Sequence, residues 1–360
     1  MDYTNDGVEA PISKYLNLKA AANGTPISGT FELTNRCNFN CKMCYIHNSS
    51  CNSFAKNELT TREWLSICET AVSRGLVFLL LTGGEPLIRD DFAELYSGFS
   101  SLGVVISINS NGSLLCGKNA EIIKKIPPSK INVSLYGASD DTYLSLCGGK
   151  YFNIVSENID RMLDNGIKIR LNLSVTPYNA SDIDQIFEFA ELRNIPVKAT
   201  TYMYPPIRLG SAPGVNTARF SPEDAALYRM KCDILRLGKE KYQAKADNLS
   251  RLNECIDGRH FGNESVCRGG RSGYWVDYQG NMSMCGNVPE SWSIAEYGFD
   301  ECWRRVREYA ATVRLPKKCS DCSYRTVCPV CVASCLAETG SFENPPEYLC
   351  EFSKNTMKYI

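Results

Sequence analysis

Apolar, strand-like runs alternate with amphipathic, helix-like segments from about residue 29 to residue 202. Runs rich in Val, Ile, Leu and Phe predict strands, and the segments between them, several opening on Ser, Thr or Asp, predict helices. The predicted strands are 31–34, 76–83, 104–110, 131–136, 167–175 and 195–202, and the predicted helices are 60–75, 90–100, 113–125, 152–166 and 181–194. Six such units indicate a parallel α/β sheet with helices outside it, either doubly wound or a partial barrel. Ligand chemistry is then expected at the carboxyl ends of the strands.

The alternation stops at residues 203–217, which are rich in Pro and Gly and are interpreted as a domain boundary or an active-site loop. Two helical stretches at about 221–247, a hairpin-like segment at 273–285, a helix near 298–311 and a cysteine-dense tail follow. The predicted division is an N-terminal extension (1–28), an α/β domain (29–217), bridging helices (218–262) and a C-terminal domain (263–360). The tail cannot rely on a large hydrophobic core of its own, which favours metal sites as its stabilising element.

The chain has 360 residues, 44% of them hydrophobic, which is enough for a sizeable globular core. Its 39 Lys and Arg residues balance 40 Asp and Glu residues, so we expect neither nucleic acid nor an anionic membrane as the partner. No signal segment opens the chain, and no apolar run approaches the roughly 18 to 20 residues of a membrane span, so we expect a cytoplasmic protein. In a reducing compartment, 18 cysteines favour metal or catalytic roles over disulfides.

Three of these cysteines, Cys37, Cys41 and Cys44, follow the first predicted strand at the spacing C-x3-C-x2-C. Three thiolates on one loop can converge on one metal centre, and they leave a four-iron cluster one ligand short. A structural zinc site closes with four protein ligands, whereas three cysteines leave one iron open to an exogenous ligand. His47 and Cys51 lie nearby in the sequence and can complete a zinc site, which is the alternative for this motif.

A second motif, TGGEP, ends the second predicted strand. Its glycines, Gly83 and Gly84, allow a ligand to approach the backbone closely, and the Glu85 carboxylate suits an ammonium group. Together, CNFNCKMC and TGGEP resemble the radical S-adenosylmethionine (radical SAM) superfamily. The resemblance implies a partial (β/α)6, TIM-like barrel, a 4Fe–4S cluster on the three cysteines, and S-adenosylmethionine bound to the open iron through its amino and carboxylate groups. It also implies cleavage of that cofactor to a 5′-deoxyadenosyl radical, which abstracts a hydrogen atom from the substrate.

Further cofactor contacts are carried over from the resemblance. Asn109 and Ser110 end the third predicted strand as candidate polar contacts, and Ser134 matches a fourth-strand serine near the ribose. Arg170 or Asn172 on the fifth strand would reach the ribose or the carboxylate. For each of these residues, the alternative is a polar side chain that simply ends an ordinary strand.

The residue before the third cysteine departs from the family. It is often aromatic there and packs on the adenine, whereas this chain has Met43. The thioether can still pack against the adenine, and Tyr45 would share that contact.

The C-terminal cysteines form a second pattern. Cys267, Gly280 and Cys285 are spaced as C-x12-G-x4-C, and the segment CSDCSYRTVCPVCVASC (319–335) and Cys350 follow. This pattern resembles the SPASM extension of radical SAM enzymes, which implies two auxiliary 4Fe–4S clusters and three clusters in all. By that match, one auxiliary cluster is held by Cys319, Cys322, Cys328 and Cys350, and the other by Cys267 and Cys285.

The tail departs from the SPASM pattern where a C-x3-C step is expected. Either Cys331 or Cys335 would complete the set of Cys267 and Cys285, with Cys331 preferred, and Cys255 would supply a fourth ligand. A pair of zinc ribbons is the alternative for the tail, because C-x2-C pairs also suit zinc.

The cofactors do not determine the substrate. SPASM relatives include maturases that crosslink ribosomally made peptides, small-molecule or sugar dehydrogenases, and anaerobic sulfatase-maturing enzymes. The last group carries an Asp directly after the cysteine of the G-x4-C element, where this chain has Gly286. We therefore expect a radical SAM oxidoreductase that modifies a peptide or protein. A small-molecule dehydrogenase is the second hypothesis, and a noncatalytic iron–sulfur or zinc scaffold is the alternative outside enzymes.

The expected partners are a peptide or protein substrate and an electron donor such as flavodoxin or ferredoxin. Leader binding is expected from the barrel, the bridging region or a separate protein, because fewer than thirty residues precede the first predicted strand. No catalytic acid or base stands out. The candidates by position are Asp277, Tyr278, Glu290, Tyr202 and Tyr204, with core or surface roles as the alternative for each.

Overall fold

The computed structural model describes residues 11–46, 57–254, 262–263 and 267–360. Within this part of the chain, one nine-stranded sheet has the order β6-β5-β4-β3-β2-β1-β7-β8-β9. The strands are β1 (Ser28–Glu32), β2 (Phe78–Thr82), β3 (Val105–Ser110), β4 (Lys130–Ser134), β5 (Ile169–Ser174), β6 (Val197–Thr200), β7 (Gly273–Val276), β8 (Asn281–Ser283) and β9 (Ser291–Ser293). Neighbours from β6 through β1 to β7 pair in parallel, and the β7-β8-β9 edge is antiparallel.

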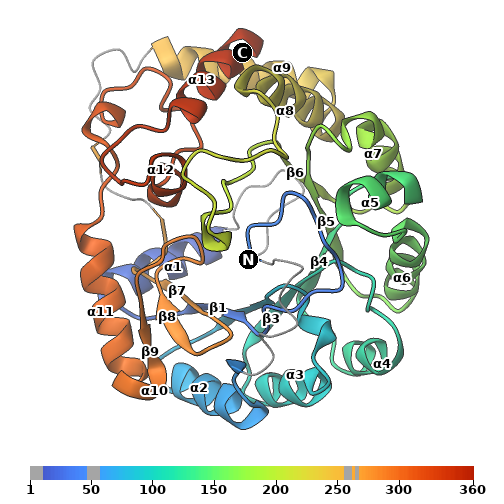
Figure 1. Ribbon diagram of the computed structural model, residues 1–360, viewed down its shortest axis with the longest axis vertical. Coiled ribbons are helices and arrows are strands. Elements are labelled where there is room, and N and C mark those ends of the chain that lie inside the picture. The colour runs from blue at the N-terminus through green and yellow to red at the C-terminus, as the bar shows by residue number, and fades with distance from the viewer. Residues whose placement is uncertain (1–10, 47–56, 255–261, 264–266) are drawn as a thin grey trace.

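Helices surround the parallel strands on the outside. They are α2 (Thr61–Ser73), α3 (Phe92–Ser101), α4 (Gly117–Lys125), α5 (Asp140–Cys147), α6 (Phe152–Asp164) and α7 (Ile183–Leu192). Figure 1 shows them as a ring around the curved sheet. Because helices cover one face of the sheet and not both, the partial barrel is confirmed over the doubly wound arrangement. All six predicted β/α units are present, and α5 is an additional helix that the sequence did not predict.

The barrel strands present different side chains to their two faces, because successive residues on a strand point to opposite sides. Leu79 and Leu81 of β2 are buried against the helices, as is Ile108 of β3. Asn109 and Asn132, whose side chains are joined by a 2.8 Å hydrogen bond, face the lumen instead. The interior of this barrel is therefore polar and hollow at the level where a cofactor is expected.

The cysteine-rich region continues the same sheet, because β7 pairs with β1 from Ser28↔Gly273 to Phe31↔Val276. The predicted hairpin is present as β7 and β8, and the predicted helix near 298–311 is α11 (Phe299–Thr312). The remaining helices are α1 (Pro11–Asn23), α8 (Pro222–Leu237), α9 (Lys239–Glu254), α10 (Ile294–Tyr297), α12 (Val332–Thr339) and α13 (Glu347–Thr356). Of these, α8 and α9 match the two helical stretches expected at 221–247.

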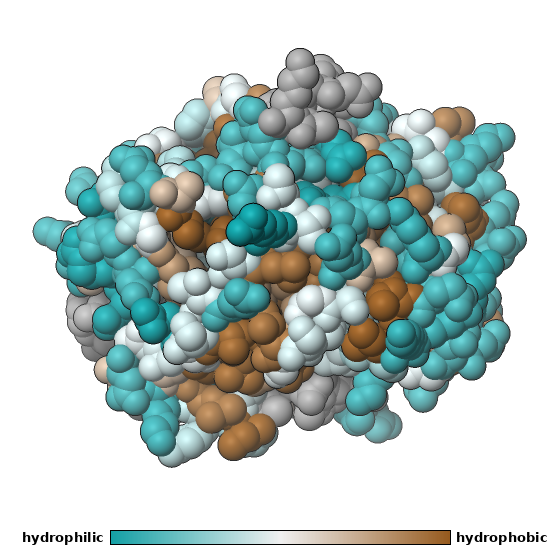
Figure 2. All heavy atoms as spheres, turned by 90° about the horizontal axis from the view of Figure 1, so that it is seen from below, coloured by the Kyte–Doolittle hydropathy of each residue, from teal (hydrophilic) through white to brown (hydrophobic). Residues whose placement is uncertain are grey.

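The outer surface is largely polar. Figure 2, which views the molecule from below relative to Figure 1, shows mostly hydrophilic side chains with hydrophobic ones gathered near the middle of that face. Among the described residues, none of the helices has the length and apolar character needed to cross a lipid bilayer.

Candidate active site

Three partly buried cysteines lie on the loop that follows β1: Cys37, Cys41 and Cys44. The backbone of this loop is bonded to the end of α5. The Asn40 N–H donates to the Cys147 carbonyl and the Lys42 N–H donates to the Leu146 carbonyl, both at 2.9 Å. The unpredicted helix α5 therefore supports the loop from one side.

Two side chains anchor the first half of the same loop. Phe39 stacks on Tyr151 with ring centroids 4.0 Å apart and meets Tyr143 edge-on. Arg36 forms two parallel hydrogen bonds with the Glu58 carboxylate, each of 3.0 Å, a geometry that adds specificity as well as energy. The conformation of the loop is thus determined by the protein around it.

The electrostatics of the loop suit bound thiolates. Burial raises the pKa of the Cys37 thiol to about 12, while the Phe39 N–H donates to its sulfur at 3.4 Å and opposes that rise. The Cys41 thiol is hydrogen-bonded to Cys147, and that bond together with burial raises its pKa. A cationic metal centre would keep such thiols ionised, and N–H donors to cysteine sulfur are typical of iron–sulfur ligation. The residues therefore fit a cluster at this position.

Gly83 and Gly84 join the second motif to the cysteine loop. The Gly84 N–H donates to the Thr34 carbonyl at 2.9 Å, and the Glu85 N–H donates to the Arg36 carbonyl at 2.8 Å. A Cβ on Gly84 would lie 2.7 Å from the carbonyl carbon of Arg36, and one on Gly83 would overlap Thr34. The glycines thus permit a close approach between two loops of the protein, in addition to any approach of a ligand.

Glu85 is fully buried, and its carboxylate accepts hydrogen bonds from the protein. The Asn111 N–H donates at 2.6 Å, the Ser110 hydroxyl at 3.0 Å and the Leu87 N–H at 3.1 Å. Burial raises the pKa of Glu85 to about 7 against the opposing effect of these donors. The carboxylate therefore links its own turn to the end of β3, and its contact with the ammonium group of the cofactor stays a prediction.

Four predicted cofactor residues line one cavity of about 500 Å³ inside the barrel: Asn109, Ser134, Arg170 and Asn172. Ser110 points to the other face of β3, toward Glu85, as the alternation of side chains on a strand requires. Lys130 and Lys198 line the same cavity, and no Asp or Glu is found among the described residues of its wall. Such a lumen suits an anionic group, for example the carboxylate of a cofactor.

Met43 and Tyr45 lie on the loop outside this lining. Met43 is 8% exposed and belongs to the main hydrophobic core. Burial raises the pKa of Tyr45, and the nearby Cys285 and Glu32 raise it further. Tyr45 therefore lies between the cysteine loop and the C-terminal region, and the packing of either residue on an adenine stays a prediction.

An ion pair that the sequence did not predict lies at the end of β1. The fully buried Glu32 carboxylate accepts hydrogen bonds from Arg208 at 3.0 and 3.1 Å and from the Trp275 indole N–H at 2.9 Å. Burial raises the pKa of Glu32, and Arg208 is the main opposing influence.

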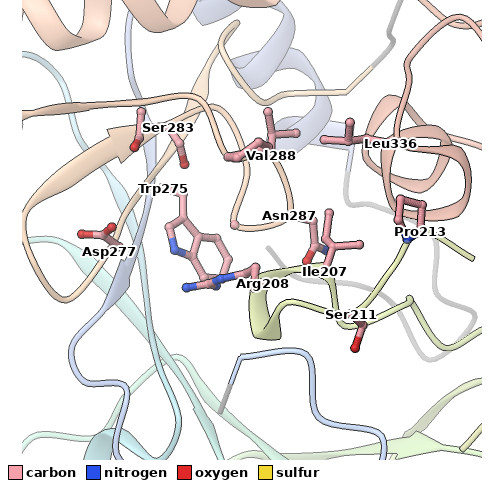
Figure 3. A pocket seen from close by; sticks show the side chains of 14 residues that line it. Ile207, Arg208, Ser211, Pro213, Trp275, Asp277, Ser283, Asn287, Val288 and Leu336 are labelled. Carbon is pink, nitrogen blue, oxygen red and sulfur yellow. The ribbon is translucent and has the colours of Figure 1, made fainter. Parts of the chain in front are cut away.

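Arg208 and Trp275 line a cavity of about 360 Å³ between the 203–217 segment and the β7-β8 hairpin (Figure 3). The expectation of an active-site loop at 203–217 was the one sequence signal for this cavity.

Gly286 lines the same cavity and lies against the ring of Trp275. A Cβ at this position would lie 2.8 Å from the indole ring, so the ring occupies the space that any larger residue would need. The Asp277 carboxylate is also in the wall of this cavity. It accepts hydrogen bonds from the backbone N–H groups of Gln279 and Asn281, each at 2.9 Å, and thereby shapes the β7-β8 turn. Asp277 thus has a turn-forming role.

The other candidate bases have structural surroundings. Tyr202 donates to the Glu338 carboxylate at 2.7 Å, and Tyr278 is buried. Glu290 is exposed at the surface. Tyr204 differs from them, because its hydroxyl lies 3.4 Å from the sulfur of Cys331.

The first auxiliary set comes together in the structure as Cys267, Cys285 and Cys331. Their sulfurs accept backbone N–H groups of Gly269, Asn287 and Ser334 at 3.4 to 3.5 Å. Burial raises the pKa of Cys285 to about 11, and the proximity of Cys267 and Cys331 contributes to that rise. This set repeats the N–H to sulfur pattern seen at Cys37.

Cys335 is fully buried on α12. Burial raises the pKa of its thiol most, and among the other cysteines Cys319 has the largest effect on that pKa. Of the two residues considered for the first auxiliary set, Cys331 is the one that interacts with Cys285. Cys255, proposed as the fourth ligand, lies outside the described residues, as do His47 and Cys51.

The second auxiliary set lines a single cavity of about 20 Å³: Cys319, Cys322, Cys328 and Cys350. Burial raises the pKa of Cys319 to about 11, and the other three thiols raise it further. Within the described ranges, no three His, Cys, Asp or Glu side chains are arranged to hold a single metal ion.

Residues 31–190 match the family model of the Radical SAM superfamily. An AdoMet-dependent heme synthase from Methanosarcina barkeri is 26% identical over 336 residues, which are 88% of this chain and 94% of that protein. The structure of Streptococcus suis SuiB bound to precursor peptide SuiA has a TM-score of 0.65 at 16% identity, over 97% of this chain and 84% of that one. Native anSMEcpe with bound AdoMet has a TM-score of 0.69 at 14% identity, over 93% and 96%. At these identities the two structures show a shared fold.

The sequence motifs, the geometry and the comparisons agree with one another. The C-x3-C-x2-C loop is held against the TGGEP turn at the carboxyl ends of parallel strands, beside a polar lumen, and the family model covers both motifs. The part of this chain that carries both motifs, residues 31–190, is therefore similar to the Radical SAM superfamily.

Proposed function

We propose that this radical SAM enzyme oxidatively modifies or crosslinks a ribosomally made peptide. The match of residues 31–190 to the Radical SAM family model supports S-adenosylmethionine and a 4Fe–4S cluster, which Cys37, Cys41 and Cys44 would hold. When bound, the two supply a 5′-deoxyadenosyl radical that takes a hydrogen atom from the substrate. The observation that carries the proposal is the cysteine loop, which packs against Gly83 and Gly84 in a barrel whose lumen is lined by cationic and amide side chains.

The oxidative part of the proposal is supported by the two further cysteine sets. Loss of a hydrogen atom leaves a substrate radical, which becomes a closed-shell product once one electron and one proton are removed. Auxiliary clusters on the two sets would accept that electron, giving three clusters in all. Flavodoxin or ferredoxin would supply the electron that starts the reaction.

The cavity beside Arg208 is our candidate for the position of the reacting substrate segment. The Trp275 indole gives it a flat wall, and the 3.0 Å pairing of Arg208 with Glu32 holds the guanidinium in one orientation. The same wall includes Gly286, and Cys285 directly precedes that residue in the chain. A substrate here would lie between the cysteine loop and the first auxiliary set.

The choice of a peptide is supported by the fold shared with SuiB in its complex with SuiA. A tetrapyrrole is the second candidate, because the similarity to an AdoMet-dependent heme synthase extends along 88% of the chain. A sulfatase-maturing reaction is disfavoured, since Trp275 fills the space above Gly286 where those enzymes carry an Asp. A small-molecule dehydrogenase and a noncatalytic scaffold are further outcomes that the experiment separates.

Anaerobic reconstitution followed by an assay with dithionite tests the proposal. We expect about 12 iron atoms per chain, four for each of three clusters, and formation of 5′-deoxyadenosine. With a ribosomal peptide encoded beside the gene, mass spectrometry should show loss of hydrogen from the peptide. Turnover of a tetrapyrrole or a sugar instead would replace the peptide, and low iron content without cleavage of S-adenosylmethionine would leave only the scaffold.

A further inference from the structure

A separate cavity of about 370 Å³ lies between the end of β6 and the helices α8, α9 and α13, which gather on that side of the barrel (Figure 1). Thr200 lines both this cavity and the barrel lumen. Tyr204 is also in its wall, and the hydroxyl of that residue contacts the sulfur of Cys331. The cavity therefore borders the barrel lumen at Thr200 and the auxiliary residue Cys331 at Tyr204.

Three cations and one carboxylate line this cavity: Arg229, Arg236, Lys245 and Asp233. Asp233 accepts hydrogen bonds from Arg236 at 2.8 Å and from Lys245 at 2.7 Å. One carboxylate therefore serves two cations. Burial opposes ionisation of Asp233, but these two partners outweigh it and lower its pKa.

No ion pair of Arg229 is found among the described residues, although the Asp233 carboxylate, which pairs with Arg236 and Lys245, also acts on its charge. Its guanidinium donates one hydrogen bond, of 3.0 Å, to the Val327 carbonyl and faces the Phe352 ring at 5.5 Å from the ring centroid. A guanidinium has five N–H donors, so most of its donor capacity is left for a ligand. Burial lowers the pKa of Arg229, which indicates that the protein compensates its charge only in part. Ile360 lies in a narrower neighbouring cavity that Arg229 and Lys245 also line.

We infer that this cavity binds a carboxylate group of the substrate, at a distance from the carbon that loses hydrogen. The planar fork of an arginine matches a carboxylate with two parallel hydrogen bonds, and the cavity volume is at the lower end of the roughly 300 to 1,000 Å³ usual for ligand sites. The inference rests on the proposed function and narrows it to substrates that carry an acid. An acidic peptide residue and a tetrapyrrole propionate share this chemistry.

Binding to the reconstituted protein tests the inference. The peptide probes are acetyl-Gly-Glu-Gly-amide and acetyl-Gly-Gln-Gly-amide, and the tetrapyrrole probes are coproporphyrin III and its tetramethyl ester. We expect the acid of one pair to bind at least about tenfold more tightly than its neutral partner, with the preference weakening as salt is added. Which pair shows the preference identifies the source of the carboxylate.

Variants of the cations locate the binding. Arg229→Gln should weaken binding of the acidic probe about tenfold and remove the preference, and Lys245→Gln, on a more exposed side chain, should weaken it about threefold. Arg62→Gln, the same change on an exposed residue of α2, should bind like the wild type. Iron content and thermal midpoint show whether each variant is folded.

Two results would overturn the inference: no preference for the acid in the wild type, or unchanged binding in both cavity variants. The first would also be the result if the chain's own terminus occupied the cavity. Failure of the proposed function has a different signature, because S-adenosylmethionine would then not be cleaved by the wild type even though the acidic probe binds.

Discussion

The N-terminal cysteine loop and the C-terminal cysteine set are held in place in different ways. Distant segments hold the loop: Gly84 and Glu85 donate to its backbone, the end of α5 accepts from it, and Glu58 pairs with Arg36. The second auxiliary set instead comes from the short segment 319–328 and from Cys350 of α13, around a cavity of about 20 Å³. A site that must keep one position open for a cofactor needs a scaffold, whereas a site closed by four cysteines can obtain much of its stability from the group it binds.

Removing the ligands of the loop should have the largest effect. With Cys37, Cys41 and Cys44 all replaced by Ala, we expect no 5′-deoxyadenosine, because no residue would hold the cluster that donates the electron. About eight of the expected 12 iron atoms should remain in the tail. Iron analysis and the cleavage assay measure both values.

Cys68→Ala is the matched control for that variant, since Cys68 is a fully buried thiol on α2. It should retain all iron and cleave S-adenosylmethionine. If the triple variant lost all of its iron, the two cysteine regions would not be independent.

Gly84→Ala should have the next largest effect, because the added Cβ would lie 2.7 Å from the Arg36 carbonyl carbon and would push the loop away from β2. We expect loss of the loop cluster and at least a tenfold lower rate of cleavage, with iron in the tail unchanged. Gly273→Ala is the control, since its Cβ would meet neighbours at 3.5 Å or more. Equal activity of the two variants would show that the scaffold of the loop is not required.

Local signals made the barrel and both cysteine patterns predictable from sequence. Each strand is a short apolar run, and α2 opens on a capping box of Thr60 and Glu63, so these features are determined within a few residues of the chain. The spacing of the cysteines is likewise a local property. The roles of Asn109 and Ser110 could not be separated from sequence. The fold shows that Asn109 faces the lumen, whereas Ser110, on the opposite face of β3, donates to Glu85.

The cavity beside Arg208 was not predictable in the same way, because long-range contacts build it. Glu32 lies 176 positions from Arg208 and 243 positions from Trp275 in the chain. No periodic pattern links three such residues, and the parallel pairing of β7 with β1 that brings Trp275 to this point is also invisible in the sequence. Helix α1 was missed for a different reason: Ile12, Tyr15 and Leu18 are exposed, so no apolar stripe faces the core.

A narrower comparison, within the C-terminal region, is between Cys331 and Cys335 as the third ligand of the first auxiliary set. Cys331→Ala should lose about four iron atoms and the signal of one auxiliary cluster, because its sulfur interacts with Cys285 and accepts the Ser334 N–H. Cys335→Ala should keep all its iron and lower the thermal midpoint slightly, as expected for a small buried thiol. Electron paramagnetic resonance of the reduced proteins distinguishes them, and the reverse result would assign the ligand to Cys335.

The smallest effect is expected at the ion pair that connects β1 to the 203–217 segment. Arg208→Met leaves the Glu32 carboxylate buried without its main cation, which should destabilise the protein by about 2 kcal/mol, less than a wholly buried pair because Arg208 is 24% exposed. The pKa of Glu32 is already raised by burial, and losing Arg208 raises it further. A carboxyl with a raised pKa in the folded state stabilises the protein when protonated, so the loss of stability in Arg208→Met should be small at low pH and grow as pH rises through that pKa.

Adding Glu32→Gln should remove the pH dependence of this loss of stability. Thermal midpoints across pH for the wild type and for the single and double variants measure it. A deficit that did not change with pH in the Arg208→Met protein would mean that Glu32 is neutral in the wild type and that the two residues do not form an ion pair.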